Sequence, residues 1–556
     1  MNRALIGAAK VANGGWRRAC GVVPLLVIVG VGVALRAWPF GERSFWFDEA
    51  FSWRLASFPW RELFQRSALD NNPPLFYVLL KIWIACFGDS PAAMRSLSLL
   101  AGAAGCVGVY LMVVEAFREP GAIEAARRQW TGLFAAALIA VTTLQIRWGG
   151  EARMYALGAA LAAFSTWLLL RALRAPLGAR PSKTGQAAHS RAASAPVNCA
   201  TTGEIIARVT TAAVSPLHAW AFYALAALAF MYTHTYALFS VVAQAVFALG
   251  YLFAEGRYDP ATLFRGRRFR RAVVAFGLVA AGWLPWVPVL VRQNEQVQDA
   301  YWTPPLTRWS VPGICHQIFA DPENRSPDNT HAAIAAAMCC VVLLALLWRP
   351  RAGDWLLLLS AALPTVLAVT ISARGRNILS VGCFIFAQVF LLAALARVVA
   401  RIAHWPERTI VAGVILGTLL LLHADYVRRL DVPSNTGLRL AAEHLRARRR
   451  RGEPVIVCYP FFYLPVRYYL RDDPECYLLE PERRLLHFEG TAALAHDDVI
   501  KRGELARLAA KRAWVVGDLA GGVKGWRERS RVEFFEGFGI RGSVTVVEYA
   551  TCAAHR

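Results

Sequence analysis

The stretch GVVPLLVIVGVGVALRAWPF (residues 21–40) is followed directly by GERSFWFDEAFSW (41–53). A helix that crosses a bilayer needs about 20 mostly apolar residues, and the first stretch has that length and composition. The second stretch places two carboxylates, Asp48 and Glu49, among aromatic side chains beside the apolar run. Because a buried charge is costly unless it is paired or used, the pair indicates a functional site at a membrane surface.

Similar apolar runs recur through most of the chain. Of its 556 residues, 56% are hydrophobic, which is too apolar a composition for a water-soluble protein of this size. The first run lacks a small-residue cleavage site and is followed by further runs, so we expect it to remain as a span rather than a signal peptide. The predicted spans lie near residues 21–40, 91–116, 131–147, 154–172, 219–233, 236–254, 272–291, 332–348, 355–372, 378–396 and 410–427.

These runs predict an all-α polytopic membrane domain of about 11 transmembrane helices over residues 1–427. A shorter run around residues 73–87 is expected to form a partial or interfacial helix. The segment around 175–215, rich in Ala, Arg, Ser, Pro and Thr, is typical of a flexible loop.

The loops differ in charge in a way that predicts orientation. A net charge of +23 would suggest a nucleic-acid partner in a soluble protein, but here the basic residues gather in alternate loops, which is the positive-inside pattern. We therefore expect a cytoplasmic N-terminus, Asp48 and Glu49 outside, and no nucleic-acid partner. The basic loops contain Arg3, Lys10, Arg17 and Arg18; Arg171, Arg174, Arg180, Lys183, Arg191 and Arg208; and Arg257, Arg265, Arg267, Arg268, Arg270 and Arg271.

After about residue 428 the apolar runs stop and a small soluble α/β domain is predicted over residues 428–556. Eleven spans from a cytoplasmic start place this domain outside, although the basic run at 446–451 is more typical of the cytoplasmic side. The segments expected to form it are a helix capped by residues 434–436 and ending near 450, strands at 455–458, 513–516 and 544–547, and helices at 461–471 and 501–512.

Two features of the sequence suggest cofactors only superficially. The loop GDLAGGVKG (517–525) lacks the Gly-Lys-Ser/Thr end of a phosphate-binding loop, so a plain turn is expected. The 11 cysteines have neither metal-ligand spacing nor the pattern of a disulfide framework. We therefore expect no metal and no cofactor.

Alternating topology brings several polar clusters to the same face of the membrane as Asp48. The face would offer carboxylates, which can abstract a proton, and arginines, whose guanidinium groups bind phosphate well. Such a set fits group transfer from a membrane-borne phosphate ester. Single charged residues at helix ends also commonly anchor a span, and His234 alone is also typical of a polar helix end. The clusters are FDE (47–49), DNNPPLFY (70–77), RWGGEARMY (147–155), YTHTY (232–236) and SARGRN (372–377).

The order of these motifs resembles the membrane glycosyltransferases of the GT-C class. Asp48-Glu49 after the first span, then NPPLFY (72–77) and EARMY (151–155), are most similar to the bacterial relatives of the protein O-mannosyltransferases and of the lipid A aminoarabinose transferase. Further similarity covers THTY (233–236), WLPW (283–286), YWTPP (301–305) and RNIL (376–379), so that the resemblance extends over about residues 20–400. Asn377 and Asn72 depart from it, since the family often has Tyr at the former position and the aminoarabinose transferase a basic residue at the latter.

The resemblance implies transfer of a sugar from a polyprenyl-phosphate donor to a lipid, glycan or protein acceptor, on the periplasmic side of a bacterial inner membrane, by inverting displacement. It implies Asp48 as the general base and Glu49 as its orienting partner in the catalytic site, and Arg153 and Arg376 as stabilisers of the leaving phosphate. No Asp-x-Asp motif for a metal-held sugar nucleotide occurs. The implied substrate-binding residues are Asp70, Asn72, Glu151, Arg153, Tyr155, His234 and Arg376.

Two other functions remain open from the sequence. A transporter or flippase of polyprenyl phosphate or another lipid would also be polytopic and would use arginine to hold a phosphate, although transporters tend to carry ionisable residues at the membrane midplane and paired repeats. An inactive scaffold whose C-terminal domain binds a partner is the other alternative.

Overall fold

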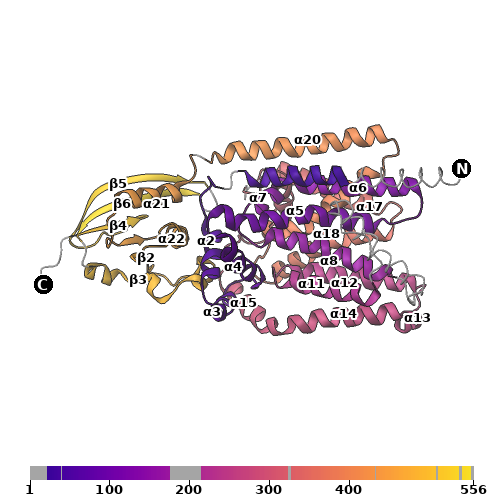
Figure 1. The fold of residues 1–556 in the computed structure, drawn as a ribbon, viewed down its shortest axis with the longest axis horizontal. Helices are drawn as coiled ribbons and strands as arrows, with labels where there is room; N and C mark the ends of the chain where they lie inside the picture. The colour runs from indigo at the N-terminus through magenta and orange to yellow at the C-terminus, as the bar shows by residue number, and fades with distance from the viewer. Residues whose placement is uncertain are drawn as a thin grey trace, which may run out of the picture.

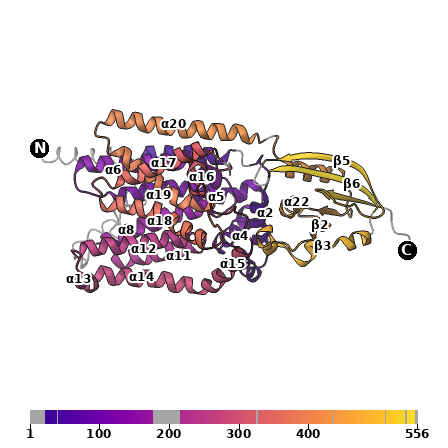
Figure 2. The same cartoon turned by 180° about the vertical axis from the view of Figure 1, so that it is seen from behind.

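The computed structural model describes residues 22–38, 41–175, 215–323, 327–432, 434–508, 511–537 and 541–551. A long helical bundle carries a small sheet domain at one end, as Figures 1 and 2 show from opposite sides. Most of the predicted loop at 175–215, and the basic residues before residue 22, lie outside the described residues.

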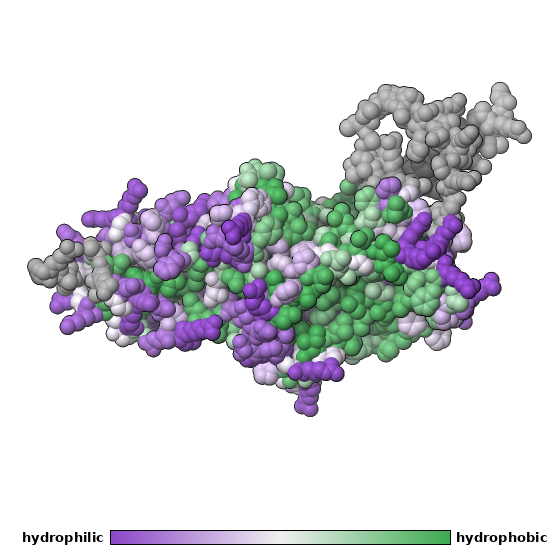
Figure 3. All heavy atoms as spheres, turned by 90° about the horizontal axis from the view of Figure 1, so that it is seen from below, coloured by the Kyte–Doolittle hydropathy of each residue, from purple (hydrophilic) through white to green (hydrophobic). Residues whose placement is uncertain are grey.

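Seven helices in the described part of the chain are long and apolar enough to cross a membrane. Six of them are α5 (Pro91–Ala116), α8 (Tyr155–Arg174), α12 (Ala237–Glu255), α17 (Asn329–Leu346), α18 (Ala352–Arg374) and α20 (Trp405–Leu430). The seventh, Arg267–Asp299, joins α14 (Arg267–Trp283), the short 3-10 helix η1 (Leu284–Trp286) and α15 (Val287–Asp299). Figure 3 shows the hydrophobic belt that these helices present, with polar surface at both ends.

The remaining helices are shorter or broken. The pair α6 (Ala122–Val141) and α7 (Thr143–Gly149) is bent by 63° and forms an eighth candidate span if counted as one. Three more predicted spans coincide with apolar helical stretches of 10–17 residues: Val22–Ala37, α11 (Pro216–Met231) and the part Phe384–Ala400 of α19 (Val381–Ala400). The predicted membrane fold is therefore confirmed, whereas the count of 11 spans is not. The run at 73–87 forms the short apolar helix α4 (Leu75–Phe87).

A buried arginine fixes the bend between α6 and α7. Arg36, at the end of the first helix, donates hydrogen bonds to the carbonyls of Ile139 (2.8 Å) and Ala140 (3.0 Å), which lie in the last turn of α6. The C-terminal end of a helix leaves such carbonyls without hydrogen-bond partners and carries partial negative charge. A guanidinium group donates the missing hydrogen bonds and supplies a positive charge. Gly102 and Gly149 make room for this side chain, because a Cβ at either would lie within 3.0 Å of its Nε. Arg36 thus holds the first helix, α5, α6 and α7 together.

The two ends of the bundle differ in charge as the sequence predicts. The helix α13 (Pro260–Arg265) and the basic first turn of α14 lie at the end away from the sheet domain (Figure 1). The opposite end carries α2 (Phe47–Ser57), α3 (Trp60–Ser67), α4 and the sheet domain. The C-terminal domain and the Asp48–Glu49 pair therefore lie at the same end of the molecule.

The C-terminal domain contains a six-stranded sheet in the order β3-β2-β1-β4-β6-β5. Parallel pairing joins β1 to β2 and β4, and β2 to β3, whereas β6 is antiparallel to β4 and β5. The strands are β1 (Val455–Val457), β2 (Cys476–Leu479), β3 (Val499–Ile500), β4 (Arg512–Val516), β5 (Trp526–Glu536) and β6 (Gly542–Thr551); the helices are α21 (Gly437–Arg448), α22 (Pro460–Tyr469) and the 3-10 turns η2 (His487–Glu489), η3 (Thr491–Ala493), η4 (His496–Asp498) and η5 (Arg502–Arg507).

The strands predicted at 455–458, 513–516 and 544–547 are confirmed as parts of β1, β4 and β6. The helix predicted at 501–512 is wrong, because only the short turn η5 forms there and β4 begins at Arg512. The predicted cap of α21 is also wrong. Thr436 occupies the N-cap position without a side-chain cap, and the Glu536 carboxylate instead accepts a hydrogen bond from the Leu438 amide at 3.0 Å. The loop at 517–525 is a turn between β4 and β5, as expected, with Gly517, Gly521, Gly522 and Gly525 at positive φ.

The sheet domain and the bundle share one hydrophobic core. The rings of Phe47 on α2 and Phe461 on α22 lie 4.9 Å apart, and those of Trp53 and Tyr468 lie 5.2 Å apart. An ion pair of 3.0 Å between Arg54 and Asp498 borders this contact. The domain is therefore packed directly on the helix that carries Asp48.

We predict that Gly158→Ala destabilises the bundle. A Cβ at this position of α8 would lie 2.4 Å from Cε1 of Phe386 on α19, whose ring is almost fully buried. Overpacking of this kind costs about 1–3 kcal/mol, more than the roughly 1 kcal/mol that alanine gains over glycine in a helix. Thermal unfolding in detergent measures the effect. The matched control is Gly250→Ala in α12, which has open space around it; equal melting temperatures for the two variants would contradict the packing described here.

Candidate active site

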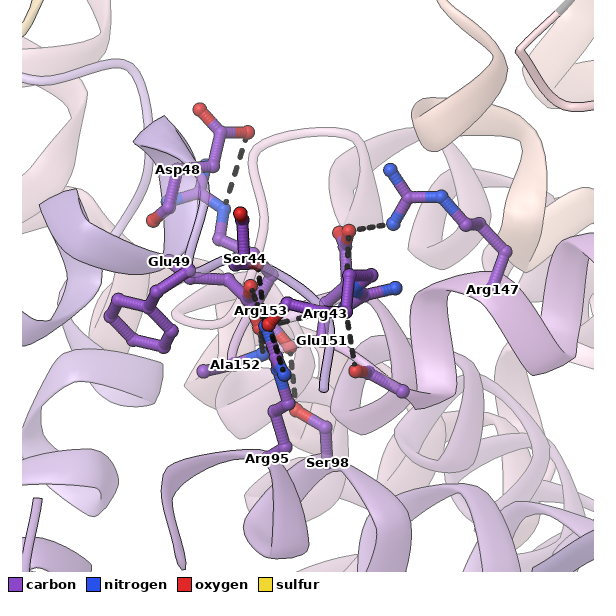
Figure 4. A network of polar contacts seen from close by, with 12 residues as sticks. Arg43, Ser44, Asp48, Glu49, Arg95, Ser98, Arg147, Glu151, Ala152 and Arg153 are labelled. Atoms are coloured by element: carbon purple, nitrogen blue, oxygen red, sulfur yellow. Dashed lines mark hydrogen bonds and ion pairs between the residues drawn. The ribbon is translucent and has the colours of Figure 1, made fainter. Parts of the chain in front are cut away.

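The helix α2 begins at Phe47, so Asp48 and Glu49 occupy its first turn. Negative side chains are favoured there because the first amide groups of a helix carry partial positive charge. Successive residues of a helix point about 100° apart, and the two carboxylates accordingly point in different directions (Figure 4). The pair noticed in the sequence therefore separates into two different environments.

Glu49 lies in the protein interior and holds three segments together. Its carboxylate accepts hydrogen bonds from Nε and Nη2 of Arg95 on α5, each at 2.7 Å, and from the Ala152 amide at 3.0 Å (Figure 4). Burial raises the pKa of Glu49, but Arg95 and the amide outweigh this effect, and the pKa is lowered. Glu49 does not line the cavity described below. Its hydrogen bonds go to Arg95 and to the Ala152 amide, and so it joins α2 to α5 and to the loop before α8.

Asp48 has the opposite environment. Its side chain keeps 27% of its surface exposed, and its Oδ2 lies 3.6 Å from Nε of Arg153. Burial raises the pKa of this carboxyl, and the neighbouring Arg153 guanidinium opposes that rise without cancelling it. A carboxylate that is accessible and more basic than usual is suited to accept a proton.

Arg153 connects Asp48 to Asp70. Its Nη1 donates to Oγ of Ser52 and to the hydroxyl of Tyr77, each at 3.3 Å. The Tyr77 hydroxyl in turn donates to Oδ2 of Asp70 at 3.2 Å, and the same oxygen accepts a hydrogen bond from Asn72 at 3.2 Å. The sequence-predicted residues Asp48, Asp70, Asn72 and Arg153 are thus brought together around one guanidinium.

Tyr155 and His234 lie beside this group. The ring of Tyr155 is 4.1 Å from Trp148 and 5.6 Å from His234, and the His234 ring also lies 5.2 Å from Phe386. His234 is only 5% exposed. Burial, together with the charge of Arg153, lowers the pKa of this imidazole to about 3. His234 is therefore neutral throughout the physiological range.

These residues open into a cavity of about 1390 Å³. Asp48, Asp70, Asn72, Arg153, Tyr155 and His234 all line it. One part of its wall is apolar and comes from the bundle: Leu238, Phe239, Leu290, Val291, Ile371, Ile378 and Val381. Another part comes from the C-terminal domain: Tyr459, Phe461, His487, Phe488, Gly490 and Arg541. Among the residues that the structure describes, no group of three or more His, Cys, Asp or Glu could hold a metal ion.

Two of the predicted substrate-binding residues do not line the cavity. Glu151 is fully buried, where it forms an ion pair with Arg147 and lies 3.7 Å from Arg43, so its charge is taken up by protein guanidinium groups. Arg376 is exposed and turns toward the end of α15, donating to the Asp299 carbonyl at 3.0 Å. Its neighbour Asn377 lines the cavity instead. The predictions that Glu151 and Arg376 contact a substrate are not supported by this geometry.

Comparison with known proteins places this geometry in a fold. No family model matches the chain, and no curated protein matches its sequence. Among solved structures, ArnT from Cupriavidus metallidurans in the apo state is similar with a TM-score of 0.52 at 14% identity, covering 96% of this chain and 98% of that chain. The chain has the GT-C fold. ArnT bound to undecaprenyl phosphate has a TM-score of 0.50 at 13% identity, again covering 96% and 98%.

A third GT-C structure, the arabinofuranosyltransferase AftD from Mycobacteria, is similar over 96% of this chain and 40% of its own, with a TM-score of 0.48 at 13% identity. These structural neighbours are membrane glycosyltransferases of the GT-C class. The resemblance that the sequence motifs predicted is therefore confirmed at the level of the fold.

The sequence alone assigns no role to several residues that line or support the cavity. Arg147 lines the cavity and is held by Glu323 at 2.8 Å, but in the sequence it is one more arginine at a helix end. Tyr77 lies within a quoted motif, and its hydroxyl contacts become visible only in the structure. No sequence signal indicates that Phe461 and His487 reach a site built around residue 48, because nothing local records contact across 400 residues.

We predict that Glu49→Gln destabilises the protein by about 3–5 kcal/mol, the usual cost of leaving one member of a buried ion pair unpaired. The unpaired group would be Arg95, which is fully buried. Because folding lowers the pKa of Glu49, the contribution of the pair is present above the ordinary carboxyl pKa and is lost as the pH falls through the lowered value. The difference in stability between the wild type and Glu49→Gln should therefore become smaller at acidic pH.

Thermal unfolding in detergent at two pH values measures this gap. Glu443→Gln on α21, where the side chain is largely exposed, is the control and should unfold like the wild type. A Glu49→Gln protein as stable as this control would show that the ion pair does not hold α2 in place.

Proposed function

We propose that this protein transfers a sugar from a polyprenyl-phosphate donor to a hydroxyl group of a lipid, glycan or protein acceptor, with inversion at the anomeric carbon. One observation carries the proposal: an accessible carboxylate of raised pKa, Asp48, lies 3.6 Å from the guanidinium of Arg153 at the wall of a large cavity. The GT-C fold, whose other members here are glycosyltransferases, gives the reaction class.

In the proposed reaction Asp48 accepts the proton of the acceptor hydroxyl. The hydroxyl oxygen forms its bond to the anomeric carbon while the bond from that carbon to the phosphate oxygen breaks. The electron pair of the broken bond leaves with the polyprenyl phosphate, whose charge Arg153 stabilises. A positioned base contributes about 10²–10⁴-fold, and a cation aimed at the developing charge is often the larger contribution.

The apolar wall of the cavity supports a lipid-linked donor. It is formed by side chains of α12, α15 and α18, among them Leu238, Val291 and Ile371. An isoprenoid tail would remove this surface from water, at roughly 25 cal/mol per Å² buried. ArnT, of the same fold, has been solved with undecaprenyl phosphate bound, which is consistent with a donor of this chemistry.

We further propose that the site faces the periplasm of a bacterial inner membrane. The basic turn at Arg265 and Arg267–Arg271 lies at the end away from the cavity, and basic loops favour the cytoplasmic side. On this assignment the sheet domain is periplasmic. A lipid transporter is not favoured, since Asp48, Asp70 and His234 of the cavity lie outside the candidate spans and the structural neighbours are glycosyltransferases.

Asp48→Asn is predicted to abolish transfer of sugar from a polyprenyl-phosphate donor while leaving the protein folded, because the side chain is partly exposed and asparagine keeps its size, so that only the charge beside Arg153 is lost. Turnover should fall by at least about 10²-fold. Activity in membranes or detergent, with a folding check by thermal unfolding, measures both. Asp497→Asn, whose carboxyl is fully exposed in the C-terminal domain, is the control. Wild-type turnover by the Asp48 variant would remove Asp48 as the base.

Arg153→Gln is predicted to move the acid limb of the pH–rate profile to higher pH. Arg153 lowers the pKa of Asp48 against the effect of burial, so its removal raises that pKa and leaves Asp48 protonated over a wider pH range. The maximal rate should fall as well, because the leaving phosphate loses its cation. Profiles of kcat and kcat/KM measure the two effects separately. Arg428→Gln, at an exposed position of α20, should keep the wild-type profile; an unshifted acid limb in Arg153→Gln would contradict the electrostatic coupling.

A further inference from the structure

His234 is held in one tautomer by the backbone. It lies between α11 and α12, and the amide of Tyr236 donates a hydrogen bond to its Nδ1 at 3.1 Å. A neutral imidazole has one donor and one acceptor nitrogen. Since Nδ1 accepts here, the proton of the neutral ring is on Nε2.

The surroundings of the ring fix its orientation and its charge. Three aromatic rings lie within 5.6 Å of it, those of Tyr155, Tyr236 and Phe386. The charged group that affects the pKa of His234 is Arg153. Two titratable side chains, Tyr155 and Tyr236, pack against the His234 ring, and α19 contributes the apolar ring of Phe386. Burial and the charge of Arg153 both disfavour an imidazolium, so the ring stays neutral.

The Nε2–H group has no acceptor within the described protein, although His234 lines the cavity. This donor is therefore free to form a hydrogen bond with a molecule bound in the cavity. The acceptor would be an oxygen near Arg153, which is where the proposed reaction places the phosphate of the donor.

We infer that His234, through its neutral Nε2–H, is a hydrogen-bond donor to a phosphoryl oxygen of the polyprenyl-phosphate substrate. This inference rests on the proposed function. The tautomer and the orientation of the ring are set before the substrate arrives, so no reorganisation accompanies the reaction. The group adds a donor beside Arg153 without adding a second positive charge to the site.

Two substitutions separate this role from a structural one. The amide nitrogen of glutamine reaches about as far as Nε2, so His234→Gln keeps a donor in the cavity and loses the acceptor for the Tyr236 amide. Asparagine reaches only as far as Nδ1, so His234→Asn keeps that acceptor and loses the donor. Both are neutral at all pH values.

The expected result is that His234→Gln retains most of the wild-type kcat, whereas His234→Asn loses kcat on the order of 10- to 100-fold, the effect of one hydrogen bond to a charged group. The pH profiles of the wild type and of His234→Gln should have the same limbs, because His234 does not titrate. The reverse order of the two variants, or a limb near neutral pH that only the wild type shows, would overturn the inference.

Equilibrium binding of polyprenyl phosphate alone, without a sugar, distinguishes this inference from the proposed function. Wild type and His234→Gln should bind it equally, and His234→Asn several-fold more weakly. If the wild type transfers no sugar but this binding order holds, the phosphate contact stands and the proposed function fails. Equal binding by all three proteins, or no binding by the wild type, overturns the contact itself.

Discussion

The ion pair between Glu49 and Arg95 is the constraint on which the site depends. It joins the first turn of α2 to α5, and the additional hydrogen bond from the Ala152 amide joins both to the loop that carries Arg153. Taking two charges out of water is expensive, and only close, fully hydrogen-bonded geometry offsets the cost. Because Glu49 is fixed in this way, its neighbour Asp48 must point outward, toward the cavity. The adjacent acids therefore have different surroundings for a geometric reason.

Much of the membrane part follows from the sequence. Long apolar runs have few alternatives to helices in a bilayer, because every backbone hydrogen bond must be satisfied internally, and each predicted run coincides with a helix. The number of spans does not follow from the sequence in the same way. Arg36 ends α6 by binding its last carbonyls, and nothing in the sequence of α6 indicates that the helix breaks there. The sheet domain was predicted in part. The apolar strands β1, β4 and β6 could be recognised, whereas the first half of β5 is mostly arginine and glutamate and most of its apolar residues come only toward its end.

Site residues could be predicted where a polar motif lies next to a span and its side chains also point into the cavity. Asp48, Asp70, Arg153 and His234 lie in polar motifs next to spans and all reach the cavity. Glu151 and Arg376 lie in equally convincing motifs but do not reach it, because Arg43 lies beside Glu151 and the end of α15 binds Arg376, and both of these partners come from elsewhere in the chain. The direction of a side chain depends on such partners. For the same reason the C-terminal contribution to the cavity wall could not be derived from the sequence.

The shared core of α2 and α22 also orders events during biosynthesis. Phe47 is made early, whereas its partner Phe461 emerges 414 residues later, about 20–80 s later at ordinary rates of synthesis. Throughout that interval Asp48 has no completed cavity around it, since Tyr459, Phe461 and His487 are missing from the wall. The nascent protein is thus inserted into the membrane span by span with an unfinished site. The cavity wall is complete only when the last domain has packed onto α2.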